Sequence, residues 1–233
     1  MTDDVTHWAS VAKDWIGWAQ APDHDSFWAY RAAFQNFIGS GSGQALEIGC
    51  GEGRVARALG ALGYEMTVAE PAPALLQAAQ EAGSAETYLA ASATNLPVDD
   101  GSFDLVVFYN VLMDVDDLPA AMTEATRVLR PGGRLMFGIV HPMADHHFLR
   151  GQGQDPGDYF ATHLMENHVE TRGVPMHFRG WRRPLSAYFE ALRQSGLLVS
   201  DVAEPQPDPD HPFTKAATRW QGLPLFFWVM ATK

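Results

Sequence analysis

Short apolar segments alternate with helix-like segments through the middle of this sequence, and this alternation constrains the fold more than any other feature. The apolar segments cover residues 44–49, 65–70, 86–92, 104–110 and 134–140, and the helix-like segments between them cover 54–63, 73–83 and 118–129. Such alternation is typical of a parallel sheet with helices on both faces. Because ligands of these sheets bind beyond the carboxyl ends of the strands, we expect the functional residues there.

The two ends of the chain complete the expected architecture. Apolar and aromatic residues recur at helical spacing in 7–20 and 26–38, and a helix-like segment at 184–196 precedes apolar runs at 197–204 and 224–232. The alternation is interrupted after His141. The sequence therefore predicts an α/β three-layer sandwich: a mostly parallel seven-stranded sheet with helices on both faces, an N-terminal helical lid and an insertion after the fifth strand.

The length of 233 residues favours one domain over two separate cores. We divide it into an N-terminal helical cap (1–40), a core (44–142), an insertion (143–183) and a C-terminal helix with strands (184–233). A proline-rich patch at 204–212 is predicted to be an exposed loop.

Charge and composition limit the partners. The net charge of -12 would repel a phosphate backbone, so nucleic acid is disfavoured. The acidic start lacks a signal pattern, and no apolar run approaches the roughly 18 residues of a membrane helix. We expect a cytoplasmic protein whose partner is a small molecule. Cys50, the single cysteine, is interpreted as a structural residue of a glycine loop.

That loop is the segment LEIGCGEGR at residues 46–54, where the first apolar run ends directly before a helix. Its glycines, Gly49, Gly51 and Gly53, let backbone amides approach a ligand closely. In dinucleotide enzymes the third glycine usually comes one residue later, at the position that Arg54 occupies here. This spacing disfavours a pyrophosphate ligand.

Two acids help to distinguish the cofactors. Glu70 ends the second apolar run, where a carboxylate can accept both hydroxyls of an adenosine ribose; the alternative is a solvated acid at a strand end. That position suits NAD and S-adenosylmethionine equally. Glu47, inside the first run, adds a second negative charge, which favours the phosphate-free, cationic S-adenosylmethionine.

Four segments together resemble the class I S-adenosylmethionine-dependent methyltransferases. They are LEIGCGEGR, VAEPAPALL, SATNLPVDDGSFDLVVFYNVLMDVDD and RVLRPGGRLMFGIVHP, within residues 44–142. The segments at 181–197 and 224–233 are also similar to the end of that family. The resemblance implies methyl transfer from S-adenosylmethionine, with S-adenosylhomocysteine as product.

The resemblance also implies roles for individual residues. Gly49, Cys50, Gly51 and Gly53 would hold the amino-acid and ribose part, Glu70 the ribose, and Pro71 would lie near adenine. Asn110 and Val111 match the position whose backbone meets the methionine moiety. Ser92 stands where the family has an acid that contacts the adenine amino group, so Ala93 is left to contact adenine through its backbone amide.

Methyl transfer is an in-line displacement, so the protein mainly aligns the acceptor with the methyl group. A base helps if the acceptor is a hydroxyl or a protonated amine, and His141 ends the fifth apolar run at a suitable place. The alternative is a turn histidine that is hydrogen-bonded before Pro142.

The remaining candidates have equally open alternatives. The insertion histidines, His146, His147, His163, His168 and His177, match no firm metal-ligand spacing, so we predict no metal site. Five arginines of the insertion, Arg150, Arg172, Arg179, Arg182 and Arg183, either bind an anionic acceptor or form a solvated face. Trp8, Trp15, Trp18, Trp28 and Tyr30 are either core residues or parts of a lid, with Trp15 and Tyr30 as the lid candidates.

Three other classes compete with a small-molecule methyltransferase. A nicotinamide oxidoreductase is disfavoured by the spacing of the loop. A non-catalytic protein that binds the cofactor would not need the insertion. Methylation of RNA is disfavoured by the net charge, whereas a protein acceptor stays open. The expected acceptor is a small molecule, anionic or aromatic, that is methylated on oxygen or nitrogen in preference to carbon.

Overall fold

The computed structural model of the chain describes residues 3–151, 153, 155–171, 173–216 and 222–233. Its centre is a seven-stranded sheet in the order β3-β2-β1-β4-β5-β9-β8. The strands are β1 (Gln44–Ile48), β2 (Glu65–Ala69), β3 (Thr87–Leu89), β4 (Phe103–Tyr109), β5 (Leu129–Val140), β8 (Leu198–Ala203) and β9 (Phe226–Thr232). β1 to β5 are parallel, and β9 is antiparallel to both of its neighbours. The predicted seven-stranded, mostly parallel sheet is confirmed.

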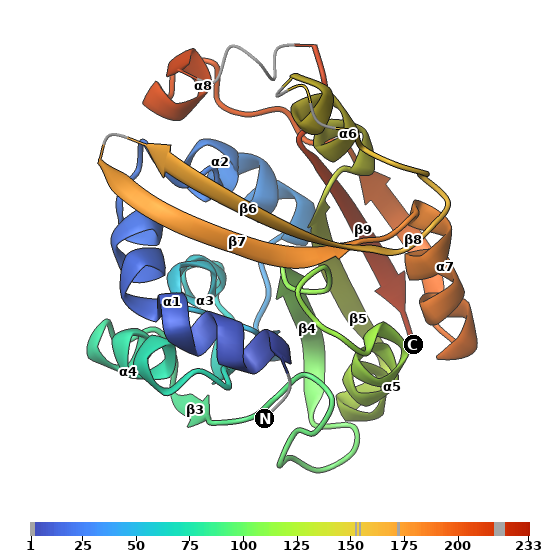
Figure 1. The fold of residues 1–233 in the computed structure, drawn as a ribbon. Helices are drawn as coiled ribbons and strands as arrows, with labels where there is room; N and C mark the ends of the chain where they lie inside the picture. The colour runs from blue at the N-terminus through green and yellow to red at the C-terminus, as the bar shows by residue number, and fades with distance from the viewer. Residues whose placement is uncertain (1–2, 152, 154, 172, 217–221) are drawn as a thin grey trace.

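Helices cover both faces of this sheet (Figure 1). One hydrophobic core joins the sheet to α5 (Leu118–Val128) and α7 (Leu185–Gln194). The other core joins the opposite face to α2 (Phe27–Ile38), α3 (Arg54–Gly60) and α4 (Pro73–Glu81). β1 shows why both faces are buried, because Leu46 and Ile48 belong to the first core and Ala45 to the second.

The N-terminal helix α1 (Asp3–Gln20) does not join either of these cores. Its Ala12 packs against Ala72 and Leu75 at the start of α4, with Trp8, Trp15 and Ile16 around them. α1 therefore lies beside the carboxyl ends of β1 and β2, on the edge of the sheet where the sequence predicts the ligand. No helix among the described residues is long and apolar enough to cross a membrane.

The insertion has regular structure that its sequence did not indicate. It contains α6 (Pro142–Gly151) and an antiparallel hairpin of β6 (His163–Thr171) and β7 (Val174–Arg182). The hairpin crosses above the carboxyl ends of β4 and β5, and β7 also packs on α1 (Figure 1). A short helix, α8 (Pro212–Ala216), follows the proline-rich patch. The division of the chain into four segments stays a prediction.

Candidate active site

The glycine loop connects β1 to α3, at the point where the strand order reverses between β1 and β4. The three glycines have φ values of 73°, 56° and 88°, a region that favours glycine. A Cβ on Gly49 would lie 2.7 Å from the Val111 side chain, and a Cβ on Gly53 would overlap Ser84. Only glycine fits these positions, and the loop thereby exposes backbone amides at the start of α3.

Glu70 connects the second strand to this loop. One oxygen of its carboxyl accepts a hydrogen bond from the Gly51 amide at 3.0 Å, and the other accepts one from the Ala72 amide at 2.9 Å. Burial raises the pKa of Glu70 to about 7, against these two hydrogen bonds, which lower it. Each oxygen keeps a second lone pair for a ligand hydroxyl.

The residues predicted to surround adenine follow β2 and β3. Pro71 is half-buried next to Glu70, and Ala93 is buried beyond β3. The Ser92 hydroxyl is 3.2 Å from that of Thr94. The ends of the two strands are joined by a hydrogen bond from the Glu70 amide to the Leu89 carbonyl, so these residues lie along one edge.

Asn110 directly follows β4 and has a strained backbone conformation. Its φ is 56°, which makes it the non-glycine residue with positive φ in the described chain, and its amide donates to the Gly138 carbonyl at 2.9 Å. Its side-chain oxygen is buried without a hydrogen-bond partner. Strain and an unpartnered acceptor together mark a ligand site, and Val111 beside it packs on Gly49.

Beneath the loop lies a group of buried charges that sequence analysis only partly found. Glu47 is buried, one of its oxygens lacks a hydrogen-bond partner, and burial raises its pKa well above the usual range. Glu52 pairs with Arg57 at 2.8 Å, and Arg54 pairs with Asp25 at 2.6 Å. The sequence offered one indication of these ion pairs, namely that Arg54 stands where dinucleotide enzymes usually have their third glycine. Cys50 is buried, and burial raises the pKa of its thiol.

The two lid candidates lie in different surroundings. Trp15 covers the loop, because a Cβ on Gly51 would lie 3.0 Å from its indole nitrogen, and the Arg54 guanidinium carbon is 5.0 Å from the ring centroid. Tyr30 is buried in the core, with its ring 4.9 Å from that of Phe226, and burial raises its pKa to about 12. The structure thus brings Trp15 to the glycine loop and leaves Tyr30 in the core.

His141 lies between β5 and α6, and both of its ring nitrogens are in contact with other groups. Nδ1 accepts a hydrogen bond from the Met143 amide at 3.0 Å, and Nε2 lies 3.2 Å from the Glu204 carboxylate. The proton of the neutral ring is therefore on Nε2. Burial lowers the pKa of this histidine, against the raising effect of Glu204. This arrangement caps the start of α6 and leaves no free lone pair for proton abstraction.

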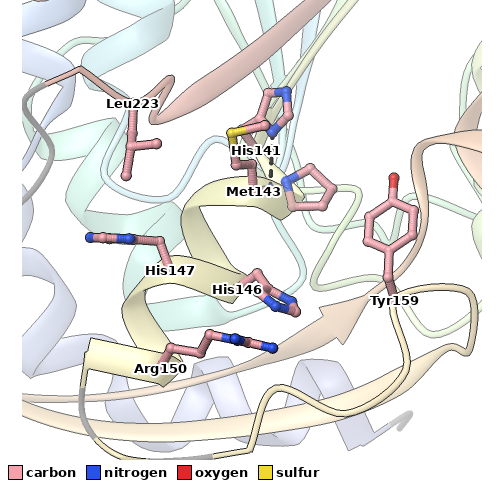
Figure 2. A pocket seen from close by; sticks show the side chains of 8 residues that line it. His141, Met143, His146, His147, Arg150, Tyr159 and Leu223 are labelled. Atoms are coloured by element: carbon pink, nitrogen blue, oxygen red, sulfur yellow. Dashed lines mark hydrogen bonds between the residues drawn. The ribbon is translucent and has the colours of Figure 1, made fainter.

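A cavity of about 620 Å³ lies next to His141, along α6. Figure 2 shows His146 and His147 projecting from this helix in different directions, the former toward Tyr159. The other insertion histidines are elsewhere: His168 stacks on His177 in the hairpin at 3.9 Å. Among the described residues, no group of three potential metal ligands was found.

The hairpin is fixed to the loop between β4 and α5. The Trp181 amide donates to the Met113 carbonyl at 2.6 Å, and its indole nitrogen donates to Asp116 at 2.9 Å. Arg183 donates to the carbonyls of Leu112 and Val115. The insertion is therefore anchored to the segment that follows β4, next to the candidate site. Of its five arginines, Arg172 lies outside the described residues.

Comparison with known proteins agrees with this geometry. Residues 46–137 match a family model described as a methyltransferase domain. These comparisons support a class I S-adenosylmethionine-dependent methyltransferase. The resemblance seen in the sequence is thus confirmed, and the matched segment runs from the glycine loop to the middle of β5.

Two curated relatives of this methyltransferase are O-methyltransferases. The chain is 31% identical over 139 residues to malonyl-[acyl-carrier protein] O-methyltransferase of Serratia marcescens, covering 58% of this chain and 51% of the relative. It is 28% identical over 167 residues to ubiquinone biosynthesis O-methyltransferase of Xanthomonas euvesicatoria, covering 69% of this chain and 64% of the relative. The chain thus spans between half and two thirds of their length.

Solved structures share the fold at lower identity. An S-adenosylmethionine-dependent methyltransferase from Mesorhizobium loti is 19% identical with a TM-score of 0.65. The match covers 91% of this chain and 100% of the other chain. One from Methanosarcina mazei is 17% identical with a TM-score of 0.59, covering 86% and 96%. These likenesses support the fold of the methyltransferase and leave its acceptor open.

Proposed function

We propose that this methyltransferase transfers the methyl group of S-adenosylmethionine to an oxygen atom of a small-molecule acceptor. The observation that carries the proposal is the Glu70 carboxyl, which joins the glycine loop to the second strand and keeps lone pairs for two ribose hydroxyls. A dinucleotide fits this site less well, because Arg54 stands where the third glycine of a dinucleotide loop usually lies.

The residues of the site fit the parts of the cofactor. We assign the ribose to Glu70, adenine to the edge formed by Pro71, Ser92 and Ala93, and the amino-acid part to the loop of Gly49, Cys50, Gly51 and Gly53 with Asn110 and Val111. The buried, unpartnered oxygen of Asn110 is an acceptor that the ammonium group of the ligand would satisfy. Trp15 would cover this site, and its aromatic face suits a sulfonium cation.

The bound cofactor supplies an activated methyl group, and the residues of the chain bind and align the acceptor. The hairpin and α1 cover the carboxyl ends of the strands, which reduces access of water. We assign His141 a positioning role, because both of its nitrogens are engaged. It stabilises the turn from β5 to α6 and thereby positions α6, which lines the cavity on the acceptor side.

Oxygen is the favoured acceptor atom because the two curated relatives above are named O-methyltransferases. A small molecule is favoured over nucleic acid because the chain has a net charge of -12. The pairing of Arg179 with acids also removes one of the basic groups that a phosphate backbone would need. Its guanidinium lies 3.8–3.9 Å from the carboxylates of Asp3, Asp116 and Glu166.

Calorimetry tests the cofactor, and mass spectrometry tests the reaction. We expect micromolar binding of S-adenosylmethionine and S-adenosylhomocysteine and no binding of NAD. Incubation with labelled S-adenosylmethionine and a metabolite extract should then yield a methylated product of identifiable mass. Tight binding of NAD without a response to either sulfur nucleoside would disprove the proposal.

A further inference from the structure

Two adjacent arginines at the end of β7 are equally buried but differently satisfied. Arg182 is 6% exposed and Arg183 is 7% exposed. The guanidinium of Arg183 donates to three backbone carbonyls, those of Leu112, Val115 and Asp116. Arg182 donates only to the Pro156 carbonyl, and its Nε and Nη1 atoms have no hydrogen-bond partner among the described residues.

The charge of Arg182 is also uncompensated. No carboxylate of the described chain lies within ion-pair distance of it. Asp145, on α6, is near enough to interact electrostatically, but burial raises the pKa of this carboxyl to about 7, so it is often neutral. A buried guanidinium with free N–H groups and no carboxylate at ion-pair distance is costly, and such groups are expected to be satisfied by a ligand.

Arg182 ends β7, and this strand is connected to the glycine loop through the segment that follows β4. Val111 packs on Gly49 of the glycine loop, and the next turn of the same segment carries Asp114, whose carboxylate lies against Gly180 of β7. Asp114 is close enough to Glu70 to interact with it electrostatically, and burial raises its pKa well above the usual range. The glycine loop, the β4–α5 segment and the end of β7 are therefore in continuous contact.

A second set of contacts locates the same region from the other side. Tyr188 of α7 is buried and interacts electrostatically with both Asp114 and Asp145. It is also hydrogen-bonded to Arg183. Polar side chains from four elements thus lie close together: the β4–α5 loop, α6, the end of β7 and α7. Among these side chains, Arg182 is the one whose N–H groups lack hydrogen-bond acceptors.

We propose that Arg182 binds a carboxylate group of the methyl acceptor, which makes the substrates of this methyltransferase small organic acids. This inference rests on the proposed function. A carboxylate matches the site better than a phosphate does, because one guanidinium offers a single positive charge.

The first test measures binding of matched acids and amides to the full chain saturated with S-adenosylhomocysteine. The probes are 3- and 4-hydroxybenzoate, 4-hydroxyphenylacetate and malonate, each paired with its primary amide and followed by ligand-observed NMR. We expect at least one acid to bind and its amide not to bind. Arg182→Gln should weaken the binding of that acid at least tenfold, whereas Arg31→Gln, at an exposed site on α2, should change it less than twofold.

The outcomes separate this inference from the proposed function. Failure of the wild-type chain to bind S-adenosylhomocysteine would contradict the proposed function itself. Normal cofactor binding, with no acid that binds better than its amide, would overturn the carboxylate site alone. Unchanged binding of the acid by Arg182→Gln would likewise overturn the carboxylate site.

The second test needs no ligand. Arg182→Met removes an uncompensated buried charge, so it should leave the thermal midpoint of the ligand-free chain unchanged or raise it by about 2–4 °C. Arg183→Met is the matched control, because it leaves three carbonyls without their donor and should lower the midpoint clearly. An equal loss of stability in both variants would show that Arg182 is structural, and would contradict the proposal.

Discussion

The proposed cofactor half and the proposed acceptor half of this molecule are built in different ways. The cofactor half consists of backbone amides, glycines with positive φ and one carboxyl at a strand end, all within a segment that matches the family model. The acceptor half consists of side chains from the insertion that meet partners distant in sequence, such as Trp181 with Asp116. A site made of backbone is encoded locally, whereas a site made of converging side chains depends on how distant segments pack.

The largest expected effect tests whether the backbone conformation of the glycine loop is required for cofactor binding. Gly53→Ala introduces a Cβ that overlaps Ser84 at a φ of 88°, so it should cost about 2–4 kcal/mol of stability and abolish cofactor binding. Gly17→Ala, in α1 with no atom within 4 Å of the new Cβ, is the control and should be neutral or stabilising. Denaturant unfolding and calorimetry with S-adenosylhomocysteine measure both variants; normal binding by Gly53→Ala would refute this view of the loop.

The next effect concerns the one side chain on which the cofactor half depends. Glu70→Ala should weaken binding of S-adenosylhomocysteine by about 1.5–3 kcal/mol, the scale of hydrogen bonds to a charged group. Its fold should be largely retained, as circular dichroism can verify. An unchanged dissociation constant would mean that the ribose lies elsewhere.

The same residue should make binding depend on pH. Because burial raises the pKa of Glu70 to about 7, the ligand-free chain holds a proton there below pH 7, and a ribose hydroxyl binds the ionised form better. Affinity should therefore rise between about pH 6 and 8, and Glu70→Gln should flatten this profile. The raised pKa has the opposite consequence for stability: the contribution of Glu70 is greatest below its unfolded pKa of about 4.5 and is lost as the pH rises to about 7.

A smaller effect is expected at His141, on the border between the halves. If it caps α6, His141→Ala should cost about 0.5–2 kcal/mol of stability, and Asn, a good N-cap residue, should restore most of the loss. Turnover should then fall by less than the roughly 10²- to 10⁴-fold that loss of a general base produces. Activity of the Ala and Asn variants across pH, beside their affinity for S-adenosylhomocysteine, distinguishes the two roles. A larger fall that Asn does not restore would identify His141 as the base.

The smallest effect tests the lid. Trp15→Ala should weaken cofactor binding by about 0.5–1 kcal/mol, the scale of a partly exposed cation–π contact. Trp18→Ala is the matched control on the same helix, because its ring packs against His24 and Phe178 instead of the glycine loop. Equal affinities of the two variants would remove Trp15 from the site.

Much of the cofactor half could be predicted from the sequence, and little of the acceptor half could. The spacing of Gly49, Gly51 and Gly53 indicated the loop, and the structure adds that Glu70 accepts a hydrogen bond from its Gly51 amide. By contrast, both lid candidates lie at helical spacing, and only packing separates Trp15 on the loop from Tyr30 in the core. The hairpin was missed because neither of its strands has a strong apolar pattern: β6 alternates between half-buried and exposed positions, and most residues of β7 are half-buried.

The sequence by itself determined the sheet, its helices and the glycine loop, because hydrophobic periodicity and glycine conformation act over a few neighbouring residues. The tertiary structure alone decided which charges are neutralised. Arg182 and Arg183 are identical and adjacent in sequence, yet one meets three carbonyls and the other retains free donors. The electrostatic state of a buried group depends on the atoms around it in space, and those come from segments about 70 residues away along the chain.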